Sequence, residues 1–131
     1  MSETDLMRQI LVAVSALPGA LFWRQQSGVF RSLGGRETVR VGIPGMADLG
    51  GVYRGRSVQI EVKTPIGRLS KEQKRWKTAV ERVGGVFVVA RNPADALTVL
   101  AALDATSGWL PTHPNEQPAS ETLAGNGEAM S

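Results

Sequence analysis

Two acidic residues and one lysine are spaced along the middle of the chain in a way that suits metal chemistry. Glu61 and Lys63 stand two residues apart in residues 57–64, where alternating apolar positions predict a β-strand. Asp48 lies upstream, between a Gly/Pro turn and a second apolar run, residues 49–53. The short connection between the two runs predicts a hairpin, and a hairpin would place Asp48 beside Glu61 near one end of a sheet.

Such a group of side chains is suited to metal-assisted cleavage of a phosphodiester bond. Carboxylate oxygens are preferred ligands of Mg²⁺ and Mn²⁺, and the ion lowers the pKa of water and neutralises phosphate charge. A neighbouring ammonium group stabilises the charge that builds on phosphorus. The alternative is an antiparallel strand with one solvated face, on which Glu61 and Lys63 form an ordinary surface pair.

The pattern around these residues resembles a nuclease family. Asp48 followed by Glu61-Val62-Lys63 is similar to the PD-(D/E)XK nuclease signature, and a longer frame resembles its VRR-NUC branch, the virus-type replication-repair nucleases. A bare D…ExK occurs by chance in many proteins, whereas the longer frame is more specific. The resemblance covers about residues 3–100. The frame is Gly42-x-Pro44-Gly45-x-x-Asp48, then Glu61-Val62-Lys63-Thr64-Pro65-x-Gly67-Arg68-x-Ser70-x-x-Gln73.

The resemblance implies a fold and a metal site. The expected fold is α/β with a restriction-endonuclease-like core, in which helices flank both faces of a mixed central β-sheet. The expected cofactor is Mg²⁺ or Mn²⁺, held by Asp48, Glu61 and the backbone carbonyl of Val62. Lys63 is then expected to position the attacking water and to stabilise charge on the phosphate.

Gln73 and Glu3 have both functional and structural interpretations. Gln73 completes a capping box with Ser70, but it also lies on the helix stripe that faces the sheet. The resemblance favours a catalytic role for Gln73, as a metal ligand or in fixing the attacking water, and the two roles are compatible. Glu3 begins a predicted amphipathic helix over residues 3–17, where an acid suits the helix dipole. Related nucleases place a Glu on this helix near the metal, so Glu3 is a candidate further ligand.

Basic residues are grouped in two regions that we expect to bind DNA. One is a predicted strand over residues 20–25 and a hairpin that pairs residues 29–33 with 36–41 across Gly34-Gly35; arginines there can grip phosphates. The other is the start of the helix after Ser70. Solvated surfaces are the alternative in both regions. The predicted DNA-binding residues are Arg24, Arg31, Arg36, Arg40, Arg68, Lys71 and Lys74.

The composition excludes several classes of site. The chain has 131 residues, no cysteine and one histidine, which excludes disulfide frameworks, thiolate zinc sites and sites that need two histidines. The formal charge is +3, but residues 1–103 hold 15 basic and 8 acidic residues, a balance that suits a polyanionic partner. We expect one nuclease domain over residues 1–110 and a flexible, polar, acidic tail over residues 111–131.

The predicted function is that of a metal-dependent endodeoxyribonuclease. Similarity to free-standing phage and bacterial VRR-NUC proteins implies branched or flapped DNA, such as four-way junctions, and a homodimer or higher assembly. No long apolar run or basic-then-apolar start is present, so we expect a cytoplasmic protein without a membrane partner. Two alternatives remain open: a non-catalytic nucleic-acid-binding module with the same fold, and a small interaction protein in which Glu61 and Lys63 pair on the surface.

Overall fold

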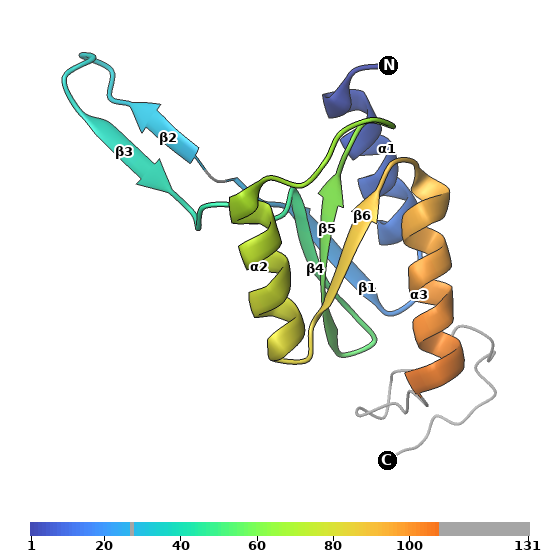
Figure 1. Cartoon of the computed structure of the whole chain (residues 1–131). Coiled ribbons are helices and arrows are strands. Elements are labelled where there is room, and N and C mark those ends of the chain that lie inside the picture. Colours follow the sequence, from blue (N-terminus) through green and yellow to red (C-terminus); the bar gives the residue numbers. More distant parts are fainter. Residues whose placement is uncertain (27, 108–131) are drawn as a thin grey trace, which may run out of the picture.

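The computed structural model describes residues 1–26 and 28–107, so the predicted tail over residues 111–131 lies outside the described part of the chain. None of the described helices is long and apolar enough to span a membrane. Figure 1 shows the arrangement of the elements. In chain order they are α1 (Glu3–Ser15), β1 (Ala20–Arg24), β2 (Gly28–Arg31), β3 (Thr38–Val41), β4 (Leu49–Tyr53), β5 (Arg56–Val62), α2 (Lys71–Arg82), β6 (Val86–Ala90) and α3 (Pro93–Ser107).

The central sheet is mixed and has four strands in the order β1-β4-β5-β6. β4 pairs antiparallel with β1 and with β5, whereas β5 and β6 are parallel. A parallel pair needs a crossover connection, and α2 provides it here. The predicted central hairpin and the predicted parallel crossover are both confirmed, and so is the α/β class.

Helices cover both faces of this sheet. On one face, the fully buried Val58, Ile60 and Val62 of β5 pack in a core with residues of α1 and α3, including Ile10 and Leu100. Burial of each such side chain contributes about 1.5–3 kcal/mol. The opposite face of β5 lies under α2 (Figure 1). β5 is therefore buried on both faces, and its polar side chains are held in a rigid setting.

The turn between β4 and β5 lies at the opposite end of the sheet from the C-terminal end of β5, and α3 is fixed to it by polar contacts. The Tyr53 hydroxyl donates a 2.7 Å hydrogen bond to Asp104, and Arg54 forms a 3.0 Å ion pair with the same carboxylate. Burial, followed by the bond to Asp104, raises the pKa of Tyr53. These contacts stabilise the end of the molecule that lies away from Asp48.

A two-stranded ribbon of β2 and β3 projects from the main body (Figure 1). Its pairing ends at Arg31 and Thr38, so the predicted two-residue turn at Gly34-Gly35 is wrong and a longer loop over residues 32–37 closes the ribbon. Of these two glycines, only Gly35 has a positive φ, of 72°, whereas a two-residue hairpin turn requires positive φ at the first position (type II′) or at both (type I′). Ser32 closes the loop instead, through backbone and hydroxyl bonds to Glu37.

Candidate active site

The β4–β5 hairpin brings Asp48 next to Glu61. Leu49 pairs with Ile60, so Asp48 and Glu61 are the next residues outward along the same register. The Asp48 Oδ2 atom accepts a 2.8 Å hydrogen bond from the backbone N–H of Val62. This bond holds the Asp48 carboxylate at the C-terminal end of β5, next to Glu61.

Glu61 is the most constrained group of the site. Its side chain is only 4% exposed, and its Oε2 atom lies 3.5 Å from the Lys63 Nζ atom. The other oxygen, Oε1, is buried and has no hydrogen-bond partner. Burial, and then the negative charge of Asp48, raise the pKa of Glu61 from 4.5 to about 7, although Lys63 opposes the change. A cation bound beside Glu61 would favour the charged carboxylate and so lower this pKa again.

Gln73 both caps helix α2 and contacts the Glu61 carboxylate. Its side-chain carbonyl accepts a 2.8 Å bond from the Ser70 N–H while the Ser70 hydroxyl accepts from the Gln73 N–H, which confirms the predicted capping box. The side-chain amide of Gln73 also donates a 2.8 Å bond to Glu61 Oε2. The cap therefore fixes the start of α2 and orients the Glu61 carboxylate with the same side chain.

A glycine sets the distance between the Asp48 loop and α2. Gly45 has φ of 80°, and a Cβ atom there would lie 2.3 Å from the carbonyl group of Glu72 and 2.7 Å from the Gln73 backbone nitrogen. Only glycine allows this close approach of two backbones. Gly45 thus keeps the first turn of α2 in contact with the segment that carries Asp48.

The donor set at this position fits Mg²⁺ or Mn²⁺. Mg²⁺ is typically held by one or two carboxylates, with waters and substrate phosphates completing the shell, and Asp48 and Glu61 supply two carboxylates. The Val62 carbonyl points to the same side of β5 as the Val62 N–H, which faces Asp48. The partnerless Oε1 of Glu61 supplies an oxygen for such an ion. Zinc, by contrast, prefers nitrogen and sulfur ligands, which none of these residues offers.

Glu3 lies outside this set. It is an exposed residue in the first turn of α1, and that turn lies at the same end of the sheet as the C-terminal end of β5 (Figure 1). Across residues 1–26 and 28–107, no three His, Asp or Glu side chains gather in a metal-binding group. The structure therefore brings two carboxylates together, and the role of Glu3 as a metal ligand stays a prediction.

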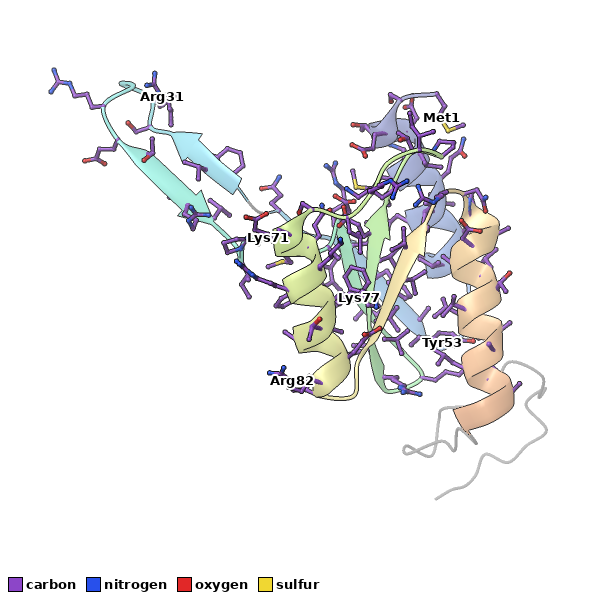
Figure 2. All side chains as sticks on the ribbon, viewed as in Figure 1. Met1, Arg31, Tyr53, Lys71, Lys77 and Arg82 are labelled. Atoms are coloured by element: carbon purple, nitrogen blue, oxygen red, sulfur yellow. The ribbon has the colours of Figure 1, made fainter. Side chains whose placement is uncertain are left out.

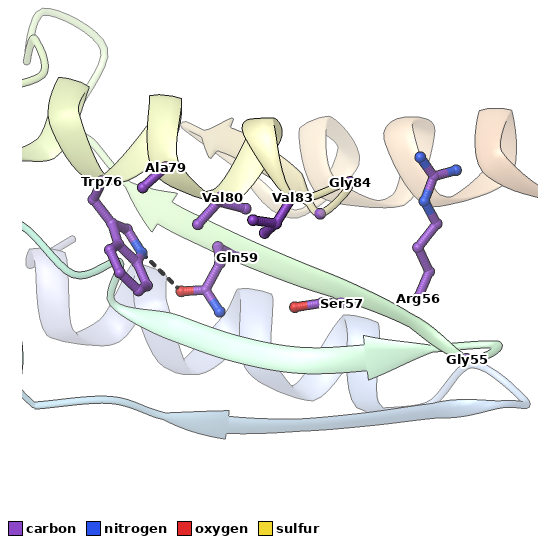
Figure 3. Close-up of a pocket in the computed structure, with 10 residues that line it drawn as sticks. Gly55, Arg56, Ser57, Gln59, Trp76, Ala79, Val80, Val83 and Gly84 are labelled. Atoms are coloured by element: carbon purple, nitrogen blue, oxygen red, sulfur yellow. Dashed lines mark hydrogen bonds between the residues drawn. The ribbon is translucent and has the colours of Figure 1, made fainter.

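A polar network behind the site was not predicted from the sequence. The Gln25 side-chain amide donates bonds of 3.1 Å to the Ala47 carbonyl and 3.0 Å to Gln59 Oε1, which also accepts a 3.0 Å bond from the Trp76 indole. The Gln59–Trp76 bond is visible in Figure 3. Gly50 leaves room for Gln25, since a Cβ there would lie 2.1 Å from its Oε1 atom. The period-two pattern of the strand, which puts Gln59 on the face of Glu61, is the signal that points to this network.

A hollow of about 520 Å³ lies beside this network, between β5 and α2 (Figure 3). Gln59, Trp76 and the apolar side chains of α2 line it, and its one ionisable lining residue is Arg56. Neither carboxylate of the candidate site borders it. The hollow is therefore separate from the acidic groups that suit metal chemistry.

Arg91 supports the loop after β5 and was also missed. Its guanidinium group donates hydrogen bonds to the carbonyls of Thr64 and Gly67, the latter at 2.9 Å. The parallel register pairs Val62, the last residue of β5, with Ala90, the last residue of β6. Arg91 directly follows Ala90 and therefore lies next to the end of β5. Because this loop connects Lys63 to α2, Arg91 fixes the approach to the site from that side.

The predicted DNA-binding arginines fall on different surfaces. Cross-strand pairing of Val29 with Arg40 and of Arg31 with Thr38 puts Arg31 and Arg40 on one face of the ribbon, and Arg36 lies in its terminal loop. Figure 2 shows Arg31 toward the outer end of the ribbon. Arg24, by contrast, pairs with Leu49 and so shares the sheet face that α1 covers, opposite Glu61.

Arg68, Lys71 and Lys74 are exposed and lie closer to the acidic pair. Arg68 is in the loop after β5, and the two lysines are in the first turns of α2, beside Gln73. No protein-family model and no curated protein matches the chain. The function is therefore inferred from the sequence frame and from the site itself.

Proposed function

We propose that the protein is a Mg²⁺- or Mn²⁺-dependent endodeoxyribonuclease with a restriction-endonuclease-like core of the VRR-NUC type. The observation that carries this proposal is the buried Glu61 carboxylate, which stands beside Asp48 and has an oxygen without a partner. A buried carboxylate beside a second, partly buried carboxylate is unfavourable unless a cation or a proton joins them. A divalent cation satisfies both, and the nearby Lys63 gives the site a group that can act on a phosphate.

Each residue then has a defined task. Asp48, Glu61 and the Val62 carbonyl would hold the ion, which would lower the pKa of water and neutralise charge on the scissile phosphate. Gln73 donates to Glu61 Oε2 and so leaves Oε1 available as a ligand. Lys63 contacts Glu61 only at 3.5 Å, and the remaining N–H groups of its ammonium can donate to a phosphate oxygen or to the attacking water.

Branched or flapped DNA, such as a four-way junction, is the substrate that we propose. Exposed basic residues are placed on two separate surfaces, the β2–β3 ribbon and α2, and two surfaces suit two DNA arms better than one straight duplex. We also expect a homodimer or a higher assembly, because the described part of the chain forms one such site and cleavage of both strands needs two.

The test is a panel of single-stranded, duplex, flap, splayed and four-way DNAs incubated with Mg²⁺ or Mn²⁺. We expect divalent-dependent cleavage by the parent and its loss in Asp48→Ala and Lys63→Ala, with DNA binding retained. Glu72→Gln is the matched control, because Glu72 is an exposed acid in the same turn of α2 as Gln73, and this variant should cut like the parent. If both alanine variants cut at the parental rate, the assigned chemistry is wrong. DNA binding without any cleavage by the parent indicates a non-catalytic module.

A further inference from the structure

The outer surface of α2 has a continuous basic stripe that extends well beyond the first turn. Positions 71, 75, 78 and 82 follow the i, i+4, i+7, i+11 spacing of one helix face, and all are exposed. A shallow hollow of about 410 Å³ follows this face. Figure 2 shows Lys71 and Arg82 at opposite ends of the helix. We call this face the α2 basic stripe; it consists of Lys71, Lys74, Arg75, Thr78 and Arg82.

The distribution of acids differs from that of an ordinary solvated helix. Glu72 and Glu81 do not line the hollow, and Glu81 is paired with Lys77, which is also off the stripe, at 3.3 Å. Among the residues that the structure describes, no ion pair joins the basic side chains of the stripe to a carboxylate. Four cations thus face solvent along one line without internal neutralisation, a charge pattern that is complementary to a polyanion.

The position of the stripe relates it to the candidate active site. α2 begins at the site, because Gln73 in its first turn bonds to Glu61, and the stripe runs away from that point. Arg82 lies eleven positions after Lys71, which is about 16 Å along the helix at 1.5 Å per residue. A DNA strand rises about 3.4 Å per nucleotide, so the stripe spans roughly five nucleotides.

We propose that the α2 basic stripe binds the sugar-phosphate backbone of a DNA arm over about five nucleotides beside the cleavage position. The inference rests on the proposed function for the choice of DNA, and it adds Arg75, Thr78 and Arg82 to the residues that contact it. Guanidinium groups hold phosphates bidentately, and the Thr78 hydroxyl is a further donor. Contacts of this kind set the register of the arm and carry no base specificity.

The expected effect on binding follows from counterion release. Each phosphate contact to duplex DNA contributes about 0.9 to the slope of log K against log salt concentration. The double variant Arg75→Gln/Arg82→Gln therefore lowers the magnitude of the slope by about 1.8. Lys77→Gln is the matched control, since it removes one positive charge from the same helix but from a side chain already paired with Glu81; its slope stays close to that of the parent.

The experiment measures the affinity of the full chain for a four-way junction, without divalent ions, from about 50 to 200 mM salt. Melting curves check that all variants are folded. An unchanged slope in the double variant overturns the proposal. So does a decrease in the slope of Lys77→Gln by about 0.9, the amount expected for the loss of one arginine contact.

Parallel cleavage assays with Mn²⁺ separate the two proposals. Cleavage by the parent together with an unchanged salt slope in the double variant contradicts the stripe and leaves the nuclease standing. A reduced slope without any cleavage by the parent supports the stripe as a DNA-binding surface and contradicts the nuclease.

Discussion

Replacement of Glu61 by glutamine should make the metal-free protein more stable at pH 8. At this pH the Glu61 carboxylate of the parent is charged, although burial and the negative charge of Asp48 both disfavour the charged form. A pKa of Glu61 raised from 4.5 to about 7 corresponds to about 3 kcal/mol of lost stability. Glutamine keeps an acceptor for the Gln73 amide and has no charge to bury, so Glu61→Gln should recover most of this free energy.

The pH dependence has a definite sign. Because the pKa of Glu61 is higher in the folded than in the unfolded state, the folded protein binds more protons between about pH 4.5 and 7. The contribution of Glu61 to stability is therefore fully favourable below that window and is lost as the pH rises through it. The difference in stability between Glu61→Gln and the parent should be small near pH 4.5 and should reach its maximum above about pH 7.

Urea denaturation in the presence of a chelator, followed at about pH 5, 6, 7 and 8, measures this difference. Addition of Mg²⁺ should then reverse the order: an ion at about 1,000 times its Kd stabilises the parent by about 4.1 kcal/mol and leaves the variant unchanged. If Glu61→Gln is less stable than the parent at pH 8, or if both proteins share one pH profile, the strained carboxylate that we infer does not exist.

Three further substitutions test the parts that position the site. Gly45→Ala should lower the free energy of unfolding by about 2 kcal/mol or more in urea denaturation, because its Cβ meets the backbone of α2. Gly35→Ala is the control: Gly35 has a similar φ but open space around it, so the loss should be only about 1 kcal/mol. Equal losses contradict the contact. Arg91→Met should lower the cleavage rate about tenfold or more with a smaller effect on melting, and a parental rate contradicts the role of its loop contacts. Gln25→Ala should cost about 1–2 kcal/mol and weaken Mn²⁺ binding in a titration, because its side chain holds Ala47, the residue before Asp48. Unchanged Mn²⁺ affinity contradicts this supporting role.

The sequence predicts the central hairpin and the crossover because their signals are local. Residues 49–53 and 57–64 are apolar runs with a short turn between them, and such a turn leaves few alternatives for the pairing. Ser70 and Gln73 form a capping box that depends on four consecutive residues. The meeting of Asp48 and Glu61 follows from the hairpin register alone.

Other features depend on contacts between distant residues, which no local pattern contains. The bonds from Arg91 to Thr64 and Gly67 form only because β6 lies beside β5. Gln25 directly follows β1 and reaches Gln59 of β5 across the intervening strand β4. The double burial of β5 was expected only from the resemblance, which implies helices on both faces of the sheet, because a strand with alternating polar and apolar residues usually has one solvated face. Here the polar face is covered by α2, and this burial is what raises the pKa of Glu61.

The most direct test of the central claim is a crystal grown or soaked with Mn²⁺ and measured for its anomalous scattering. The account predicts one strong peak between Asp48 and Glu61, with ligand distances of about 2.0–2.6 Å, and no such peak in crystals of Asp48→Ala. Fully occupied Mn²⁺ elsewhere on the protein, or no ion at this position at saturating Mn²⁺, would contradict it.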